Sequence, residues 1–253
     1  MRRKLVDSLR RKGVKEEHIL SAMEALPRHF FLEKAFEEKA YEDMAFPIGC
    51  EQTISQPYTV AYQTALLEVQ KRDKVMEIGT GSGYQAAILA LLGARVYTIE
   101  RQETLYLKTK ALLLKLGMRS VRCFFRDGTK GLPEFAPFDK ILVTAGIDRA
   151  PQTLLDQLAI GGMLVIPVGS DVQRMERITR VGEKDYRTER FDQFKFVPFL
   201  PGLKKKEEYS QKCEKRKEDI WIVLAFLAPL RFNTSSLSFP ELPATSQILA
   251  ASA

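Results

Sequence analysis

Histidine and cysteine are both scarce in this chain, whose 253 residues include two histidines and three cysteines. Cys50, Cys123 and Cys213 lie far apart and form no C-x-x-C pair, which argues against a disulfide framework and against a zinc site. His18 and His29 alone leave little material for a histidine-rich metal centre or a Ser-His-Asp triad. We therefore expect a site that holds no metal ion and uses no histidine base.

Long apolar runs are also missing, since a membrane span needs roughly 18–20 apolar residues. The best candidate, Ile220–Leu230, is too short, contains Pro229 and is followed by Arg231. The basic N-terminus lacks the apolar core of a signal peptide, because charged residues continue to Lys12. We therefore predict a cytoplasmic protein with no membrane partner.

The charge balance is only mildly basic. The formal net charge is +7, with 45% hydrophobic and 28% charged residues, which is an ordinary composition for a globular protein. The basic residues are spread along the chain, which favours a solvated surface over a nucleic-acid footprint. We expect a monomer that does not bind nucleic acid.

Two helices and a long loop are predicted in the first part of the chain. Lys4–Lys12 forms the first helix, and the second carries apolar residues at helical spacing until Pro27 ends it. A loop rich in turn formers follows over Tyr41–Pro57. Pro57 suits the first turn of the next helix, with Ser55 or Gln56 just before it.

From residue 74 the pattern alternates between strand and helix. The predicted strands are Lys74–Ile78, Arg95–Ile99, Val121–Phe125, Lys140–Thr144 and Met163–Val168, and the predicted helices are Tyr84–Leu92, Glu103–Leu116 and Pro151–Ala159. Strands separated by helices indicate a parallel sheet covered on both faces. Arg174–Val181 and Tyr186–Val197 flank a turn and predict an antiparallel hairpin that finishes the sheet. The predicted fold is a Rossmann-like, doubly wound, mostly parallel α/β sheet with this C-terminal hairpin and extra N-terminal helices.

The composition changes after Gly202. We divide the chain into a folded domain, residues 1–202, with a core over 74–202 preceded by helices and a loop over 1–73, and an appended tail, residues 203–253. The tail is charged at first, has a short apolar stretch and ends rich in Ser, Pro and Ala, so we expect disorder or loose packing there.

A glycine-rich loop follows the first parallel strand, with the sequence Gly79-Thr80-Gly81-Ser82-Gly83. Three glycines allow a tight turn and a close approach of the backbone to a ligand, at the N-terminus of the next helix. The second strand ends at Glu100, where an acid can accept hydrogen bonds from both ribose hydroxyls of an adenosine. The loop and the acid together predict an adenosine-binding site.

The glycine spacing favours one adenosine ligand over another. Dinucleotide-binding loops follow G-x-G-x-x-G, whereas this loop is G-x-G-x-G, with Tyr84 at the place of the third glycine. Glu77 resembles the acidic position of class I methyltransferases, and Asp127-Gly128 resembles the place where those enzymes bind adenine. This resemblance implies S-adenosyl-L-methionine as the cofactor, with a nucleotide-dependent oxidoreductase disfavoured.

A second stretch is more specific. The segment Phe46–Tyr58, which contains T-I-S-Q-P, resembles the protein-L-isoaspartate O-methyltransferase family, and so does Pro27-Arg28-His29-Phe30. Further matches over residues 75–85, 138–145, 161–169 and 196–202 extend the resemblance over roughly residues 4–202. It implies that residues 1–202 are an S-adenosylmethionine-dependent methyltransferase domain. It also implies transfer of a methyl group to the free α-carboxylate of L-isoaspartyl residues in damaged proteins and peptides, which is a protein repair reaction.

The resemblance also implies roles for particular residues. The family's active-site serine falls on Ser55, which implies a catalytic role there, and substrate binding is implied for Thr53, Ile54, Ser55 and Val197. Cofactor binding is implied for Glu77, Gly79, Thr80, Gly81, Gly83, Glu100, Asp127 and Gly128. A role for Ser55 as the cap of the next helix is the structural alternative. Two positions depart from the family pattern: Glu51 stands where Gly is usual, and Arg126 replaces the first Gly of G-D-G.

The expected chemistry agrees with the scarcity of histidine. An α-carboxylate has a reference pKa of about 3.3–3.7, so it is ionised at neutral pH and needs no general base. Methyl transfer is an in-line displacement, which depends on alignment, and a hydroxyl such as Ser55 can orient the carboxylate. The alternatives are a class I methyltransferase for RNA or a small molecule, and a relative that binds the cofactor without catalysis. No N/D-P-P-[YF] motif of amino methylation follows the fourth strand.

Overall fold

The structure, a computed structural model, describes residues 1–206. The predicted tail therefore lies outside the described residues from position 207 onward. Within residues 1–206, no helix has the length and apolar character that crossing a bilayer requires.

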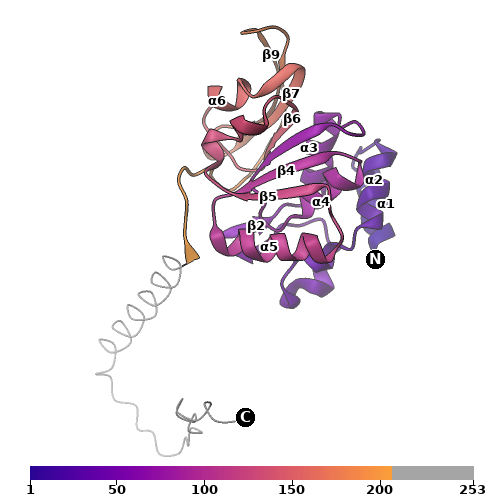
Figure 1. Cartoon of the computed structure of the whole chain (residues 1–253). Coiled ribbons are helices and arrows are strands. Elements are labelled where there is room, and N and C mark those ends of the chain that lie inside the picture. The colour runs from indigo at the N-terminus through magenta and orange to yellow at the C-terminus, as the bar shows by residue number, and fades with distance from the viewer. Residues whose placement is uncertain (207–253) are drawn as a thin grey trace, which may run out of the picture. The chain divides into compact units, whose positions relative to one another are not determined.

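The centre of the protein is a seven-stranded sheet in the order β5-β4-β3-β6-β7-β8-β9 (Figure 1). Pairing is parallel from β5 through β7 and antiparallel between β7, β8 and β9. The strand bounds are β3 Lys74–Ile78, β4 Arg95–Glu100, β5 Val121–Phe125, β6 Phe138–Val143, β7 Leu158–Val168, β8 Gln173–Arg180 and β9 Tyr186–Phe194. This arrangement confirms the Rossmann-like, mostly parallel fold and its C-terminal hairpin.

The strand order reverses at β3, which has β4 on one side and β6 on the other. Strands β3, β4 and β5 run outward in one direction along the sheet, and the chain then returns to place β6 against the free side of β3. In such sheets ligands bind at this switch point, beyond the carboxyl ends of the strands. The glycine-rich loop follows β3 directly, so the fold places it at this crevice.

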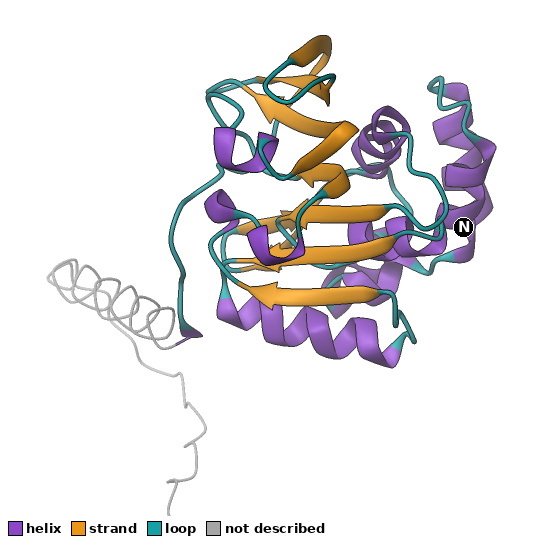
Figure 2. Ribbon diagram, turned by 45° about the horizontal axis from the view of Figure 1, so that its top comes forward, coloured by secondary structure: helices purple, strands orange, loops and turns teal. Residues whose placement is uncertain are grey.

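Longer helices cover one face of the sheet and short ones cover the other (Figure 2). Helices α3 (Pro57–Leu67), α4 (Tyr84–Leu91) and α5 (Glu103–Lys115) pack with the N-terminal helices and the strand residues of the first face. The opposite face packs against α6 (Gln152–Leu155) and the 3-10 turns η3 (Gly128–Lys130) and η4 (Pro133–Phe135). The period-2 alternation within β3 explains this, since Val75 and Met76 belong to clusters on opposite faces.

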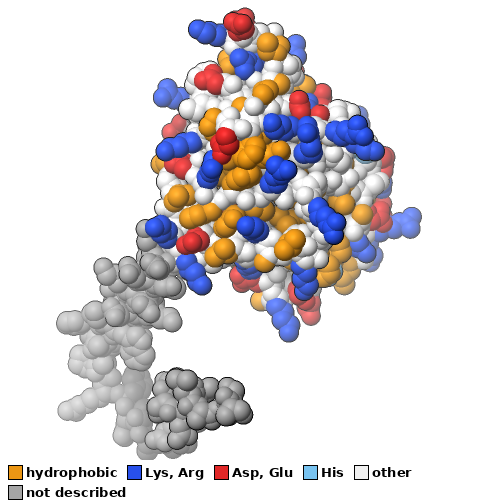
Figure 3. Space-filling model, in the orientation of Figure 1, with side chains coloured by type: hydrophobic (Ala, Val, Ile, Leu, Met, Phe, Trp, Pro, Cys, Tyr) orange, Lys and Arg blue, Asp and Glu red, His pale blue; other side chains and the backbone are white. Residues whose placement is uncertain are grey.

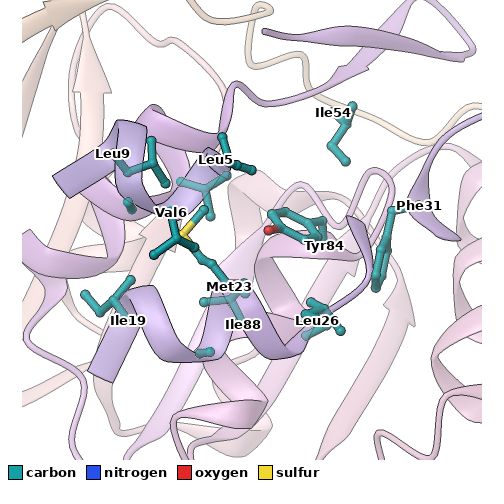
Figure 4. Packing of buried hydrophobic residues seen from close by; sticks show 14 of the residues in the cluster. Leu5, Val6, Leu9, Ile19, Met23, Leu26, Phe31, Ile54, Tyr84 and Ile88 are labelled. Atoms are coloured by element: carbon teal, nitrogen blue, oxygen red, sulfur yellow. The ribbon is translucent and has the colours of Figure 1, made fainter. Parts of the chain in front are cut away.

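The two predicted N-terminal helices are α1 (Arg2–Arg11) and α2 (Glu17–Ala25). Figure 4 shows that their apolar residues gather with Ile88 and Tyr84 of α4 and with Phe31, which belongs to the 3-10 turn η1 (Arg28–Phe31). A further turn, η2 (Lys34–Lys39), leads to the segment before α3. This packing positions the chain between η1 and α3, where the predicted substrate loop lies.

The segment predicted as a loop contains a small antiparallel hairpin, so the loop prediction was wrong in part. Strands β1 (Phe46–Gly49) and β2 (Gln52–Ile54) pair with each other, with a register irregularity after Pro47. Cys50 and Glu51 form the turn and have φ values of 54° and 59°. Two positive φ angles match the tight hairpin turn, in which Gly is preferred. A glycine at position 51 would adopt this φ angle without strain.

The helix predicted over residues 151–159 was also too long. It ends at Leu155, and β7 begins at Leu158, which pairs with Phe138 of β6. The apolar residues of 154–159 resemble a helix in sequence, but Leu158 is buried as part of the strand.

Candidate active site

A cleft of about 860 Å³, including its open mouth, lies at the carboxyl ends of β3, β4 and β6. The predicted residues that line it are Thr53, Ile54, Ser55, Gly79, Thr80, Gly81, Glu100, Gly128 and Val197. The fold thus brings together nine of the predicted site residues from segments up to 144 positions apart, while Glu77, Gly83 and Asp127 are not among the lining residues.

The glycine loop is fixed against β6. Gly79 has φ 98°, and a Cβ atom there would lie 2.4 Å from Oγ1 of Thr144, so a larger residue would clash. The Thr144 hydroxyl donates to the carbonyl oxygen of Gly79 at 2.9 Å. Thr144 follows β6 and lines the cleft, although sequence reasoning assigned it no role. No local motif marks Thr144, since only the parallel pairing of β3 and β6 brings it beside the loop.

Glu100 is buried at the end of β4 and held by backbone donors. Its carboxylate accepts hydrogen bonds from the N–H of Gly81 and of Gln102, both at 2.9 Å. Burial raises the pKa of Glu100, while the backbone donors act in the opposite direction. Each carboxylate oxygen has a further acceptor site, so Glu100 can still accept hydrogen bonds from a ligand.

Glu77 lies behind the cleft wall, fully buried in β3. The Thr98 hydroxyl donates to its Oε2 at 2.5 Å and is hydrogen-bonded at 2.7 Å to the hydroxyl of Thr80. Burial raises the pKa of Glu77 to about 8, so the side chain is mostly protonated at neutral pH. Glu77 is therefore connected to the glycine loop through two threonine hydroxyls.

Gly83 is the N-cap of α4 with φ 85°. A Cβ atom at Gly83 would lie 2.6 Å from Cγ2 of Thr109 and 3.3 Å from Cδ1 of Leu113, both on α5. This glycine allows α4 and α5 to pack closely. A cofactor contact at Gly83 stays a prediction.

Asp127 lies beside Gly128 after β5. It accepts hydrogen bonds from the N–H and the hydroxyl of Thr129 at 2.9 and 2.8 Å, and from the N–H of Gly202 at 2.8 Å. Burial alone would raise the pKa of Asp127, but the backbone donors outweigh it and lower the pKa. Gly128 itself lines the cleft, and a Cβ atom there would lie 2.4 Å from Ile78.

Residues 197–206 follow the last strand of the sheet, and we call them the strap; residues 197–200 of the strap line the cleft. At one end the N–H of Gly146 donates to the carbonyl oxygen of Val197 at 2.8 Å, and the N–H of Phe199 donates to that of Gly146 at 2.8 Å. These two hydrogen bonds attach the first residues of the strap to the segment that follows β6.

The strap is fastened again at the start of α5. The Lys204 N–H donates to the carbonyl oxygen of Arg101 at 2.9 Å, and the Glu103 N–H donates to that of Lys204 at 3.0 Å. The Arg101 guanidinium also donates to the carbonyl oxygen of Gly202 at 3.0 Å. Contacts with the folded domain therefore continue past residue 202, up to Lys206, whose N–H donates to Glu103 at 3.0 Å.

A second cavity adjoins the cleft and shares with it the lining residues Thr53, Ser55, Thr144 and Val197. The rest of its lining comes from Ala45, Gln56, Thr59, Gln193, Phe194, Lys195 and Phe196. Ser55 is therefore placed between two cavities, one built on the glycine loop and one on α3 and the end of β9.

The backbone of Ser55 is held by Arg28, a residue to which sequence reasoning gave no role. Arg28 is fully buried and donates to the carbonyl oxygen of Ser55 at 3.1 Å, to that of Met44 at 3.1 Å and to that of Ala40 at 2.8 Å. Burial lowers the pKa of Arg28 to about 10, so the guanidinium stays charged at neutral pH. Arg28 can thus fix the position of Ser55 and leave its hydroxyl free for a ligand.

The structure does not support Ser55 as a helix cap. Gln56 is the N-cap residue of α3 and makes no side-chain cap hydrogen bond. Asp43 takes that role instead, because its carboxylate accepts from the N–H of Tyr58 at 2.8 Å and from the Gln56 side chain at 3.1 Å. Lys12 of α1 pairs with the same carboxylate at 2.6 Å.

His29 and Cys50 precede Ser55 in the same N-terminal segment. His29 lines neither cavity, and its Nδ1 shares a 2.6 Å hydrogen bond with the hydroxyl of Tyr41. Burial raises the pKa of the Cys50 thiol, which disfavours the thiolate. Among residues 1–206, no three or more His, Cys, Asp or Glu side chains form a group that could hold a metal ion.

Comparison with known proteins gives one consistent result. The family model described as protein-L-isoaspartate(D-aspartate) O-methyltransferase matches residues 1–204. The protein-L-isoaspartate O-methyltransferase of Christiangramia forsetii is 55% identical over 199 residues, which cover 79% of this chain and 93% of that protein. The one of Flavobacterium psychrophilum is 56% identical over 200 residues, which cover 79% of this chain and 94% of that protein.

Solved structures agree. A structure described as a protein-L-isoaspartate O-methyltransferase matches with a TM-score of 0.73 at 30% identity, covering 80% of this chain and 67% of the other. A Plasmodium falciparum structure described as a protein of the same kind in complex with S-adenosyl-L-homocysteine matches with a TM-score of 0.70 at 23% identity, covering 78% and 97%. The second match supports the fold alone.

Proposed function

Because this chain belongs to the protein-L-isoaspartate(D-aspartate) O-methyltransferase family, we propose that its two cavities hold a methyl donor and a damaged peptide on either side of Ser55. The chain is an S-adenosylmethionine-dependent protein carboxyl O-methyltransferase. Its substrates are proteins and peptides that contain L-isoaspartyl residues, and it methylates their free α-carboxylate.

The cleft fits S-adenosylmethionine in two respects. Gly79 and Gly81 have positive φ angles and expose backbone at the switch point of the sheet, and the buried Glu100 offers acceptors for ribose hydroxyls. When bound, the cofactor supplies a methyl group activated by a sulfonium. We assign its binding to Gly79, Thr80, Gly81, Glu100 and Gly128, which line the cleft, and retain Glu77, Gly83 and Asp127 as predicted cofactor-binding residues that are not among the lining residues.

The substrate side needs orientation and no base. The carboxylate of the isoaspartyl residue is ionised at neutral pH, so the enzyme has only to align it and exclude water. We assign to Ser55 a hydrogen bond that orients this carboxylate, with Thr53, Ile54 and Val197 forming the surrounding wall. The observation that carries this assignment is that Ser55 borders both cavities while Arg28 and Asp43 hold its segment in place.

Methyl transfer from labelled S-adenosylmethionine tests the proposal. The wild type should label an isoaspartyl peptide and leave the matched aspartyl peptide unlabelled. Ser55→Ala should lower labelling by about 10²-fold, by analogy with the loss of one orienting donor, with cofactor affinity nearly unchanged in calorimetry. A variant that keeps its turnover and only melts earlier would refute the role of Ser55.

We also propose a monomeric, cytoplasmic protein that binds no nucleic acid and needs none of residues 207–253 for methyl transfer. On the face seen in Figure 3, Lys and Arg side chains are scattered over the surface and do not gather in one stripe. A single species of monomer mass in light scattering supports the monomer. Protection of a labelled RNA at physiological salt would contradict the absence of nucleic-acid binding.

A further inference from the structure

The residues that line the second cavity include a charge that the methyl-transfer reaction itself does not require. This step rests on the proposed function, because a cofactor in the cleft leaves the second cavity as the space that the peptide on either side of the isoaspartyl residue can enter. The carboxylate must meet the cofactor at the shared wall, which Thr53, Ser55, Thr144 and Val197 form. The neighbours of the isoaspartyl residue then lie against the remaining walls.

Those walls contain one charged residue. The lining residues are alanine, threonine, serine, glutamine, phenylalanine and valine, together with Lys195. Lys195 is exposed, and no carboxylate of residues 1–206 forms an ion pair with it. The nearby acid Asp43, which bonds the lining residue Gln56, is already paired with Lys12. Within the described residues, the cavity lining therefore includes one lysine that has no ion-pair partner.

The position of Lys195 follows from the end of β9. Lys195 lies in the chain between Phe194 and Phe196. Both phenylalanines pack against the hydrophobic cluster that includes buried residues of α3 and α4. The N–H of Phe196 donates to the Gln173 side chain at 2.8 Å, which fixes this segment beside β8. The segment continues to Val197, whose carbonyl oxygen is bonded to Gly146. Lys195 is thus attached to a segment that is fixed close to the shared wall.

We propose that Lys195 is a specificity-determining residue, which makes the enzyme prefer isoaspartyl sites flanked by acidic residues over sites flanked by basic ones. An exposed charge pair contributes a modest free energy that falls with salt. The resulting preference is about 2- to 5-fold in kcat/KM between peptides that differ by one charge beside the isoaspartyl residue.

The experiment uses isoaspartyl peptides in which the residue before and the residue after the isoaspartyl residue are varied one at a time to Glu, Gln or Lys. The full-length wild type should follow the order Glu, Gln, Lys in kcat/KM, with the differences shrinking at about 0.5 M salt. Lys195→Met should remove the order and Lys195→Glu should reverse it. Lys184→Glu is the matched control, because it changes the net charge equally at the exposed β8–β9 turn and should keep the wild-type order.

A second readout separates this proposal from the proposed function. Binding of the same labelled peptides is measured by anisotropy in the presence of S-adenosylhomocysteine, so it does not depend on turnover. An order of affinities that reverses in Lys195→Glu supports the specificity role even if no peptide is methylated. Methylation or binding with the same order in wild type and both Lys195 variants would overturn it, and so would an equal reversal in Lys184→Glu.

Discussion

Glu51 has a backbone conformation that its residue type disfavours. It has φ 59° in the turn between β1 and β2, where a residue with a Cβ atom costs about 1–2 kcal/mol relative to Gly. Glu51→Gly should therefore raise the free energy of unfolding by about 1 kcal/mol, after the larger entropy loss of Gly is subtracted. Urea unfolding measures this change.

Glu42→Gly is the control for that measurement, because Glu42 is exposed and is not among the residues with positive φ. Glu42→Gly should lower the stability by about 0.4–1 kcal/mol, because glycine gives the unfolded chain more conformational freedom. A loss of stability in Glu51→Gly as well would show that contacts of the Glu51 side chain outweigh the strain.

Glu77 should make the stability depend on pH. Burial raises its pKa from 4.5 to about 8, so between these values the folded protein holds a proton that the unfolded chain has lost. Stability should therefore fall as pH rises through this interval, by up to about 1.4 kcal/mol per pH unit, and be fully retained below about pH 4.5. Unfolding curves at pH 5, 6.5 and 8 test the slope.

Glu77→Gln isolates this effect, because the amide keeps the shape and stays neutral at every pH. The stability of Glu77→Gln relative to wild type should increase between pH 5 and 8. Parallel curves for the two proteins would show that the Glu77 carboxyl titrates near its ordinary pKa.

At the scale of elements, Asp43 fixes the start of α3 next to Ser55. It accepts from the backbone of Tyr58 and the side chain of Gln56, and pairs with Lys12 of α1. Asp43→Ala should cost about 1–2 kcal/mol of stability and lower kcat/KM for the isoaspartyl peptide, with cofactor affinity unchanged. Thermal unfolding and labelled methyl transfer check the two parts.

Asp43→Asn retains a cap acceptor and should keep most of the stability and the activity. Equal losses in Asp43→Asn and Asp43→Ala would assign the effect to the Lys12 ion pair. Full activity in Asp43→Ala would mean that Arg28 alone holds the Ser55 segment.

The sequence predicted the elements whose signals are local. β3 and β5 have the predicted bounds because each is a short apolar run with clear turn signals on either side. The β1–β2 hairpin was missed because its turn places Cys50 and Glu51, not glycines, at positive φ. Helix α6 was overestimated because the burial of Leu158 comes from pairing with β6.

The site residues also divide into those that a local sequence pattern marks and those that only the fold brings together. The glycine loop and Glu100 were predicted because strand and loop are contiguous, and T-I-S-Q-P marked Ser55. Arg28, Thr144 and Lys195 were not assigned roles, since only the folded chain brings them to Ser55 and Gly79. A buried arginine that bonds three carbonyl groups has no sequence pattern of its own.

At the scale of the whole molecule, the strap defines where the catalytic unit ends. A chain that ends at Lys206 keeps every strap contact and should bind S-adenosylmethionine and methylate peptide with near wild-type kcat/KM. A chain that ends at Leu200 loses the bonds of Gly202 and Lys204 to Asp127, Arg101 and Glu103. It should lose about 2–4 kcal/mol of stability and at least tenfold in cofactor affinity.

Calorimetry and unfolding of both truncated chains make this comparison, with the full chain as reference. An inactive, folded chain ending at Lys206 would show that residues 207–253 contribute to the reaction. A chain ending at Leu200 with normal affinity would show that the outer half of the strap does not support the cofactor site.

The position of the strap in the chain also orders events during synthesis. Gly79, Glu100 and Gly128 leave the ribosome early, but the cleft that they line also includes residues 197–200 of the strap, which are made after every strand of the sheet. A growing chain that has reached Phe194 thus contains all seven strands and an incomplete cofactor site. Bound cofactor can therefore stabilise the domain only after residues 197–206 have been translated. Until then, the sheet has to form without that stabilisation, through the packing of its own strands and helices.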